Sequence, residues 1–142
     1  MKKGVNLERL AEFDFVLPDK TVSFENPDLF SLDNVYCFKA YYDLLEKENP
    51  TEKIILSKLH SSFLNEHYNK NMEKKYRSVR NQKAILPRVD YEFLITGASL
   101  ATSGKNVCIL SNDLLINSAY KEILNRNSYL NKNNFVISEF EE

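Results

Sequence analysis

Apolar and polar positions along the chain fall into blocks that predict strands and helices in turn. Short apolar runs predict strands at 13–18, 52–56, 106–110 and 135–138. Apolar residues that recur at helical spacing predict helices over 31–47, 58–80, 91–103 and 114–125. Strands that alternate with helices indicate crossover connections, and therefore a parallel sheet.

This order predicts an α/β fold, a three-layer α/β/α sandwich around a mostly parallel sheet of roughly four or five strands. With 142 residues, 43% of them hydrophobic and 27% charged, the chain has the composition of a globular protein. We expect a single domain over 1–142, because no linker or repeat divides the chain. Cys37 and Cys108 both lie in apolar segments and are expected to be reduced core thiols.

The stretch 86–113 carries the most informative pattern. Asp90 is predicted to cap a helix over 91–103, which ends where Gly104 can adopt a left-handed conformation. A buried strand at 106–110 follows, and Asp113 comes directly after it, at the start of the next helix. Carboxylates at the carboxyl ends of strands lie where open α/β sheets hold their functional groups, so this pair predicts a cation site.

The same residues resemble a known family. Asp90, the apolar helix positions Leu94, Ile95 and Ala98, and the run 107–113 (VCILSND) are similar to the C-terminal half of PIN-domain nucleases. The resemblance covers about 35 residues, 86–120, roughly a quarter of the chain. It implies a PIN-like sandwich and a metal-dependent ribonuclease.

The resemblance also implies a set of acidic metal ligands for Mg²⁺ or Mn²⁺. The positions that match are Asp19, Glu66, Asp90 and Asp113. Asp14 is an alternative to Asp19, and Glu73 is an alternative to Glu66, which lies further from its strand than in typical members. Clustered carboxylates repel one another unless a cation neutralises them, and Mg²⁺ prefers oxygen ligands. Asp90 and Asp113 could equally serve as helix caps without a metal.

A basic segment precedes Asp90. Between residues 67 and 90 lie seven lysines and arginines against Glu73 and Asp90, although the whole chain has a net charge of −1. Such a segment would bind the phosphates of RNA, or it would be a solvated helix face. The predicted RNA-binding residues are Lys74, Arg77, Arg80, Lys83, Arg88, Ser111 and Asn112.

These features predict a metal-dependent endoribonuclease that cleaves single-stranded RNA. A domain of this size resembles the toxin of a toxin–antitoxin pair, which implies RNA and a cognate antitoxin or other protein as partners, and is compatible with a homodimer. The alternative is a PIN-like module that has lost catalysis and binds partners in an RNA-processing or other complex.

Other chemistries find little support in the sequence. His60 and His67 lack the spacing of a zinc peptidase, and the chain has only three glycines, too few for a phosphate-binding loop. No stretch approaches the roughly 18 apolar residues of a membrane span, and the N-terminus lacks the apolar run of a secretory signal. We therefore expect a cytoplasmic protein without a membrane partner.

Overall fold

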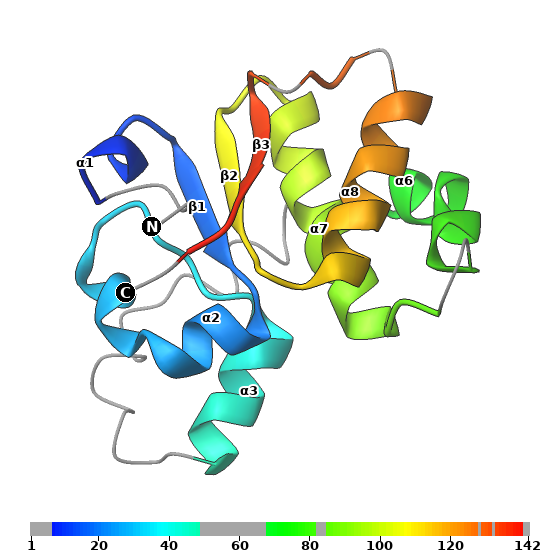
Figure 1. Cartoon of the computed structure of the whole chain (residues 1–142). Helices are drawn as coiled ribbons and strands as arrows, with labels where there is room; N and C mark the ends of the chain where they lie inside the picture. The colour runs from blue at the N-terminus through cyan, green and yellow to red at the C-terminus, as the bar shows by residue number, and fades with distance from the viewer. Residues whose placement is uncertain (1–6, 49–67, 82–84, 128, 132, 141–142) are drawn as a thin grey trace.

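The computed structural model describes residues 7–48, 68–81, 85–127, 129–131 and 133–140. Strands and helices alternate along the chain (Figure 1). The elements in chain order are α1 (Leu7–Leu10), β1 (Phe15–Pro18), α2 (Lys20–Glu25), the 3₁₀ helix η1 (Pro27–Ser31), α3 (Lys39–Glu48), α6 (Lys70–Lys75), the 3₁₀ helix η3 (Arg77–Asn81), α7 (Arg88–Thr102), β2 (Val107–Leu110), α8 (Leu114–Arg126) and β3 (Phe135–Ser138). The prediction of an α/β fold is confirmed.

The sheet of the described residues has three strands in the order β1-β2-β3, and both pairs are parallel. Phe15 lies opposite Val107, which in turn lies opposite Phe135, so the strands run in step. All four residues of β1 and of β2 are buried, as expected for strands covered on both faces. The strand expected at 52–56 lies outside the described residues.

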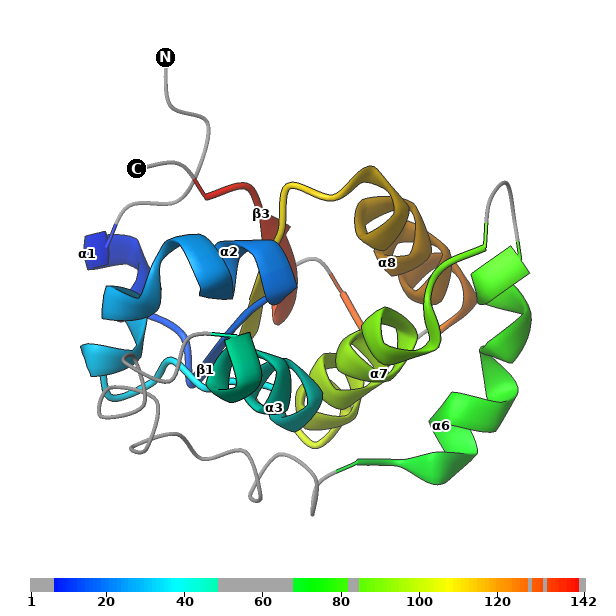
Figure 2. The same ribbon diagram turned by 90° about the horizontal axis from the view of Figure 1, so that it is seen from below.

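Helices lie on both sides of the sheet. Figures 1 and 2 show α7 and α8 on one side and α1 and α2 on the other. Gly97 lets α7 approach the sheet closely, since a Cβ there would lie 2.9 Å from Ile109 Cδ1 and 3.0 Å from Phe135 Cε1. Helix α7 and strand β2 therefore form the centre of the core.

The prediction of a helix over 31–47 is wrong for the first half of that range. Helix α3 begins only at Lys39, and Val35 pairs with Val16 in an extended, parallel bridge. Val16 N–H donates to Asn34 O at 2.8 Å, and Tyr36 N–H donates to Val16 O at 2.9 Å. The free edge of β1 offers these hydrogen bonds, and they outweigh the helical spacing of the apolar side chains.

The described part of the helix expected over 58–80 is not continuous. Asn69 has an extended backbone and caps α6, because its Oδ1 accepts from the N–H groups of Asn71 and Met72. The helix ends at Tyr76, after which the chain continues as η3. Met72 and Tyr76 are buried.

The predicted boundaries of the later elements are largely confirmed. Helix α8 ends one residue after the predicted position, β3 has the predicted bounds, and Gly104 has a φ of +98° at the end of α7. Both cysteines are free and buried, as predicted. None of the helices in the described ranges has the length and apolar character needed to cross a membrane.

Candidate functional site

The carboxyl edge of the sheet brings the predicted acids to one side of the molecule. Asp19 follows β1, and the turn 111–113 follows β2. Figure 2 looks towards this edge from below, where α2, α7 and α8 begin. Asp90 lies in the first turn of α7. Three of the four predicted ligands thus come from segments that meet at this edge.

Asp19 is buried, with 2% of its surface exposed. Its Oδ1 caps α2 by accepting from Val22 N–H at 2.8 Å. Its Oδ2 accepts from the hydroxyl of Ser111 at 2.6 Å. Its own N–H donates to Leu110 O at 2.9 Å, which holds the end of β1 against the end of β2. The backbone and Ser111 together fix this carboxylate in position.

Asp113 is the N-cap of α8, as predicted. Its Oδ1 accepts from the N–H groups of Leu115 at 2.7 Å and Ile116 at 3.2 Å. Ser111, which is fully buried, accepts from Asp113 N–H at 3.1 Å while it donates to Asp19. A single hydroxyl therefore connects the first and last acids of the predicted set.

The two polar residues before Asp113 have structural partners. The buried hydroxyl of Ser111 donates to Asp19 Oδ2 and accepts from Asp113 N–H. The amide of Asn112 makes two hydrogen bonds to the backbone of Phe140, at 2.9 and 3.0 Å. The geometry gives both residues a role in positioning the turn, whereas the sequence had suggested contacts to RNA.

Asp90 does not cap α7, contrary to the prediction. The N-cap is Pro87, so the helix begins at Arg88 and Asp90 sits inside its first turn. Asp90 Oδ1 instead accepts from the hydroxyl of Tyr41 at 2.5 Å. Tyr41 belongs to α3 and is buried, and the 49 residues that separate the pair leave no local signal in the sequence.

The negative charges of neighbouring acids act on Asp19 and Asp90. Burial raises the pKa of Asp19, and the negative charges of Asp113 and Asp90 raise it further, against the hydrogen bonds from Ser111 and Val22. Burial also raises the pKa of Asp90; Tyr41 and Lys20 act against this rise, and Asp113 adds to it. Lys20, the first residue of α2, is a nearby cation that the sequence reading missed.

The donor chemistry at this edge fits a hard divalent cation. Carboxylate oxygens are the ligands that Mg²⁺ and Mn²⁺ prefer. In the described part of the chain, Oδ2 of Asp90 and Oδ2 of Asp113 accept no hydrogen bond and remain available. Even so, no three His, Cys, Asp or Glu side chains within the described ranges are close enough to form a metal site as they stand. Coordination by all three acids would require side chains to rotate.

The remaining candidate ligands lie elsewhere. Glu66 and the two histidines fall outside the described residues. Asp14 accepts from Asn106 N–H at 2.8 Å, at the amino ends of β1 and β2, so it is at the opposite edge of the sheet from Asp19. Glu73 belongs to α6 and pairs with Arg77 at 2.6 Å, within a separate, basic pocket.

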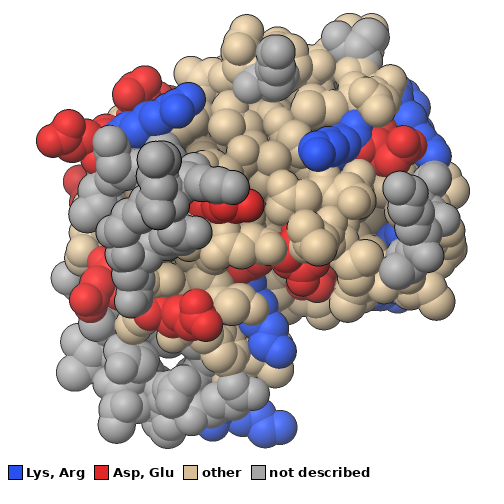
Figure 3. Space-filling view, in the orientation of Figure 1, with Lys and Arg blue, Asp and Glu red and all other residues tan. Residues whose placement is uncertain are grey.

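The basic segment is only partly free to bind anions. Arg77 pairs with Glu73 and Arg88 pairs with Glu92, both at helical spacing. Lys74 and Lys75 are exposed on α6, and Lys83 falls outside the described residues. On the face shown in Figure 3, acidic and basic side chains are interspersed and do not form one large patch of either sign.

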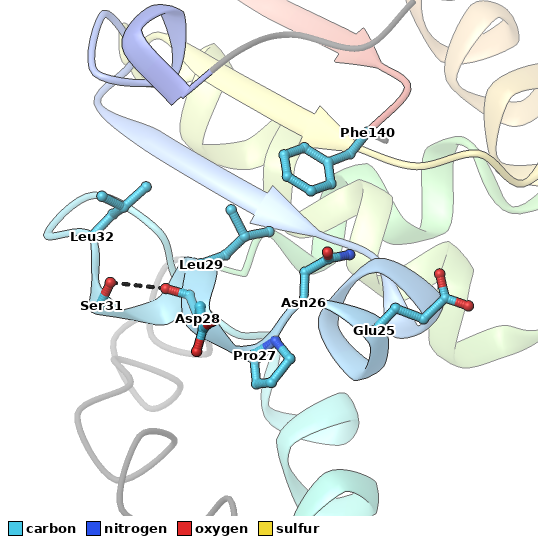
Figure 4. Close-up of a pocket in the computed structure, with 8 residues that line it drawn as sticks. All are labelled: Glu25, Asn26, Pro27, Asp28, Leu29, Ser31, Leu32 and Phe140. Atoms are coloured by element: carbon cyan, nitrogen blue, oxygen red, sulfur yellow. Dashed lines mark hydrogen bonds between the residues drawn. The ribbon is translucent and has the colours of Figure 1, made fainter. Parts of the chain in front are cut away.

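A second hollow lies between α2, η1 and the chain after β3. Figure 4 shows Phe140 and Leu29 on either side of it, with Asn26 between them, and it measures about 320 Å³. Asn112 connects it indirectly to the carboxyl edge, because its amide holds the backbone of Phe140. None of the predicted acids lines this hollow, so it is distinct from the candidate site.

Comparison with known proteins gives no independent identification, since no family model, no curated protein and no solved structure matches the chain.

Proposed function

We propose that the protein is a PIN-like, metal-dependent endoribonuclease that cleaves single-stranded RNA. The observation that carries the proposal is the placement of Asp19, Asp90 and Asp113 on segments that meet at the carboxyl edge of a parallel sheet, where the charges of Asp90 and Asp113 act on Asp19. Asp19 is buried, Asp90 is half-buried and Asp113 is exposed, and the two neighbouring negative charges disfavour ionisation of Asp19, an effect that a bound cation would offset. Glu66 remains the proposed fourth ligand.

Each acid has a distinct part in this proposal. Ser111 holds Asp19 and the backbone of Asp113, and Tyr41 holds Asp90, so each carboxylate has a defined position from which coordination of a shared cation would require rotation of side chains. When bound, Mg²⁺ or Mn²⁺ would activate a water nucleophile and neutralise charge on the leaving oxygen. Lys20 would add positive charge beside Asp90, and the arginines near α7 would bind the phosphates of the strand.

The test uses purified protein, single-stranded RNA and Mg²⁺ or Mn²⁺. We expect cleavage that EDTA stops and that Asp113→Asn reduces by more than about a hundredfold, since even partners of metal ligands are worth 10 to 100-fold. Asn is as good an N-cap as Asp, so the variant keeps the start of α8. The matched control is Asp33→Asn, at an exposed turn position, which should cleave like the wild type. Full cleavage by Asp113→Asn would refute the assignment.

A second function is favoured by two observations. Both oxygens of Asp19 are engaged and the side chain is almost inaccessible, and the described residues hold no preassembled metal site. These facts suit a module that keeps the fold, binds RNA or a protein such as an antitoxin, and no longer cleaves. RNA binding without cleavage in either metal would favour this function over the nuclease.

A further inference from the structure

A pocket of about 380 Å³ opens beside the first turn of α7, on the side that faces α6. Three arginines line it, together with one acid and one tyrosine. They are Arg77 and Arg80 of η3, Arg88 and Tyr91 of α7, and Glu73 of α6. Tyr91 fixes the arrangement, because its hydroxyl donates to Glu73 O at 2.6 Å. The volume is within the range of small-ligand pockets, roughly 300–1,000 Å³.

The charges in the pocket do not balance. Glu73 neutralises Arg77 at 2.6 Å, and Glu92 neutralises Arg88 at 3.1 Å from outside the pocket lining. Arg80 pairs with no acidic side chain in the described residues. Its Nε donates to Leu86 O at 3.0 Å, which orients the guanidinium and leaves its two terminal NH₂ groups without such a partner. Counted over the described residues, the site therefore has one uncompensated positive charge, on a side chain whose orientation is fixed.

We propose that this pocket binds one internal phosphodiester of a single-stranded RNA, with Arg80 as the main anchor. Paired NH groups of arginine match two oxygens of a phosphate. A surplus of one positive charge matches the single negative charge of an internal phosphodiester better than a doubly charged terminal phosphate. The inference rests on the proposed function, because it gives the strand a second attachment point near the carboxylates.

The position of the pocket fits that role. Arg88 and Asp90 belong to the same turn of α7, but Asp90 contacts Tyr41 of α3 while Tyr91 contacts α6. Figure 2 shows α7 between α3 and α6. A strand bound in the pocket would have to cross the first turn of α7 to reach the acids. The pocket is thus a positioning site on the path to the carboxylates.

The experiment measures binding without cleavage. Fluorescence anisotropy with a 3′-labelled oligouridylate carrying a 5′-hydroxyl, in EDTA, reports affinity at several salt concentrations. We expect Arg80→Gln to weaken binding about tenfold and to lower the salt slope by about 0.7, the value for one phosphate of a single strand. Lys105→Gln, which removes an exposed charge at the other end of α7, should change affinity much less.

A second variant is expected to increase the affinity for RNA, an effect that unfolding of the variant could not produce. Glu73→Gln removes the negative charge from the pocket and frees Arg77, and should tighten binding about two- to fivefold. Wild-type affinity in Arg80→Gln, or equal losses in Arg80→Gln and Lys105→Gln, would overturn the inference. A 5′-phosphate that tightens binding to the wild type but not to Arg80→Gln would overturn the choice of an internal phosphodiester. Because EDTA prevents metal-dependent cleavage, failure of the nuclease proposal would instead appear as binding without cleavage in Mg²⁺.

Discussion

The hydroxyl of Ser111 lies 2.6 Å from Oδ2 of Asp19, although 92 residues separate the two in the sequence. The hydroxyl oxygen of Ser111 also accepts from Asp113 N–H. The ends of β1 and β2 are thereby joined through one buried side chain, which also positions the two acids that follow the strands.

Ser111→Ala should destabilise the protein by about 1–3 kcal/mol, because it leaves Oδ2 of a buried carboxylate without its donor. Loss of this hydrogen bond should also raise the pKa of Asp19 further. Urea unfolding measures the first effect. Ser118→Ala, at an exposed position of α8, is the control and should stay within about 0.5 kcal/mol of the wild type. Equal stability of the two variants would show that the Ser111 contact contributes little.

In metal-free buffer, the contributions of Asp19 and Asp90 to the free energy of unfolding should decrease as the pH rises above about 3.8. Both pKa values are raised in the folded protein above that ordinary value, so the unfolded chain loses these protons first. Asp90→Asn removes one of the two groups, and its amide oxygen can still accept from Tyr41. As the pH rises above about 3.8, the unfolding free energy of Asp90→Asn should therefore increase relative to that of the wild type. A difference that is independent of pH would contradict the prediction.

Mg²⁺ or Mn²⁺ should stabilise the folded protein, because a cation at the carboxylates binds the folded state preferentially. At a concentration tenfold above the dissociation constant the gain is about 1.4 kcal/mol. Thermal unfolding with and without EDTA measures it. The gain should be absent in Asp113→Asn and present in Asp33→Asn; an equal gain in both variants would place the cation elsewhere.

Gly97→Ala should destabilise the protein by about 1–3 kcal/mol, although alanine favours helices, since the new Cβ would meet Ile109 Cδ1 at 2.9 Å. Ile109→Val removes that one atom and should cost about 0.5–1.5 kcal/mol alone. In the double variant the alanine should cost less than it does alone. Additive effects in this cycle would show that the clash with Phe135, at 3.0 Å, dominates instead.

The sequence predicted best where local chemistry decides the conformation. Asp113 caps α8 and Gly104 ends α7 because a short acceptor and a residue without Cβ are suited to those positions. It failed where distant parts of the chain decide. Val35 leaves the helical pattern to pair with β1, and Asp90 finds its donor on Tyr41 of another helix. Neither contact leaves a local trace in the sequence. The position of Asp19 at the end of a strand was predictable from local sequence, but the hydrogen bonds around the acids come from distant residues and were not.

The capping role of two acids limits their denticity. Asp113 Oδ1 is occupied by the N–H groups of Leu115 and Ile116, and Asp19 Oδ1 by that of Val22. Oδ2 of Asp113 accepts no hydrogen bond in the described residues and Oδ2 of Asp19 accepts only from Ser111, so neither carboxylate would offer a cation a chelating pair of oxygens. Ca²⁺ commonly requires 6–8 oxygen ligands, including bidentate carboxylates, whereas Mg²⁺ keeps several waters and needs few protein ligands. The helix caps would thus select against calcium.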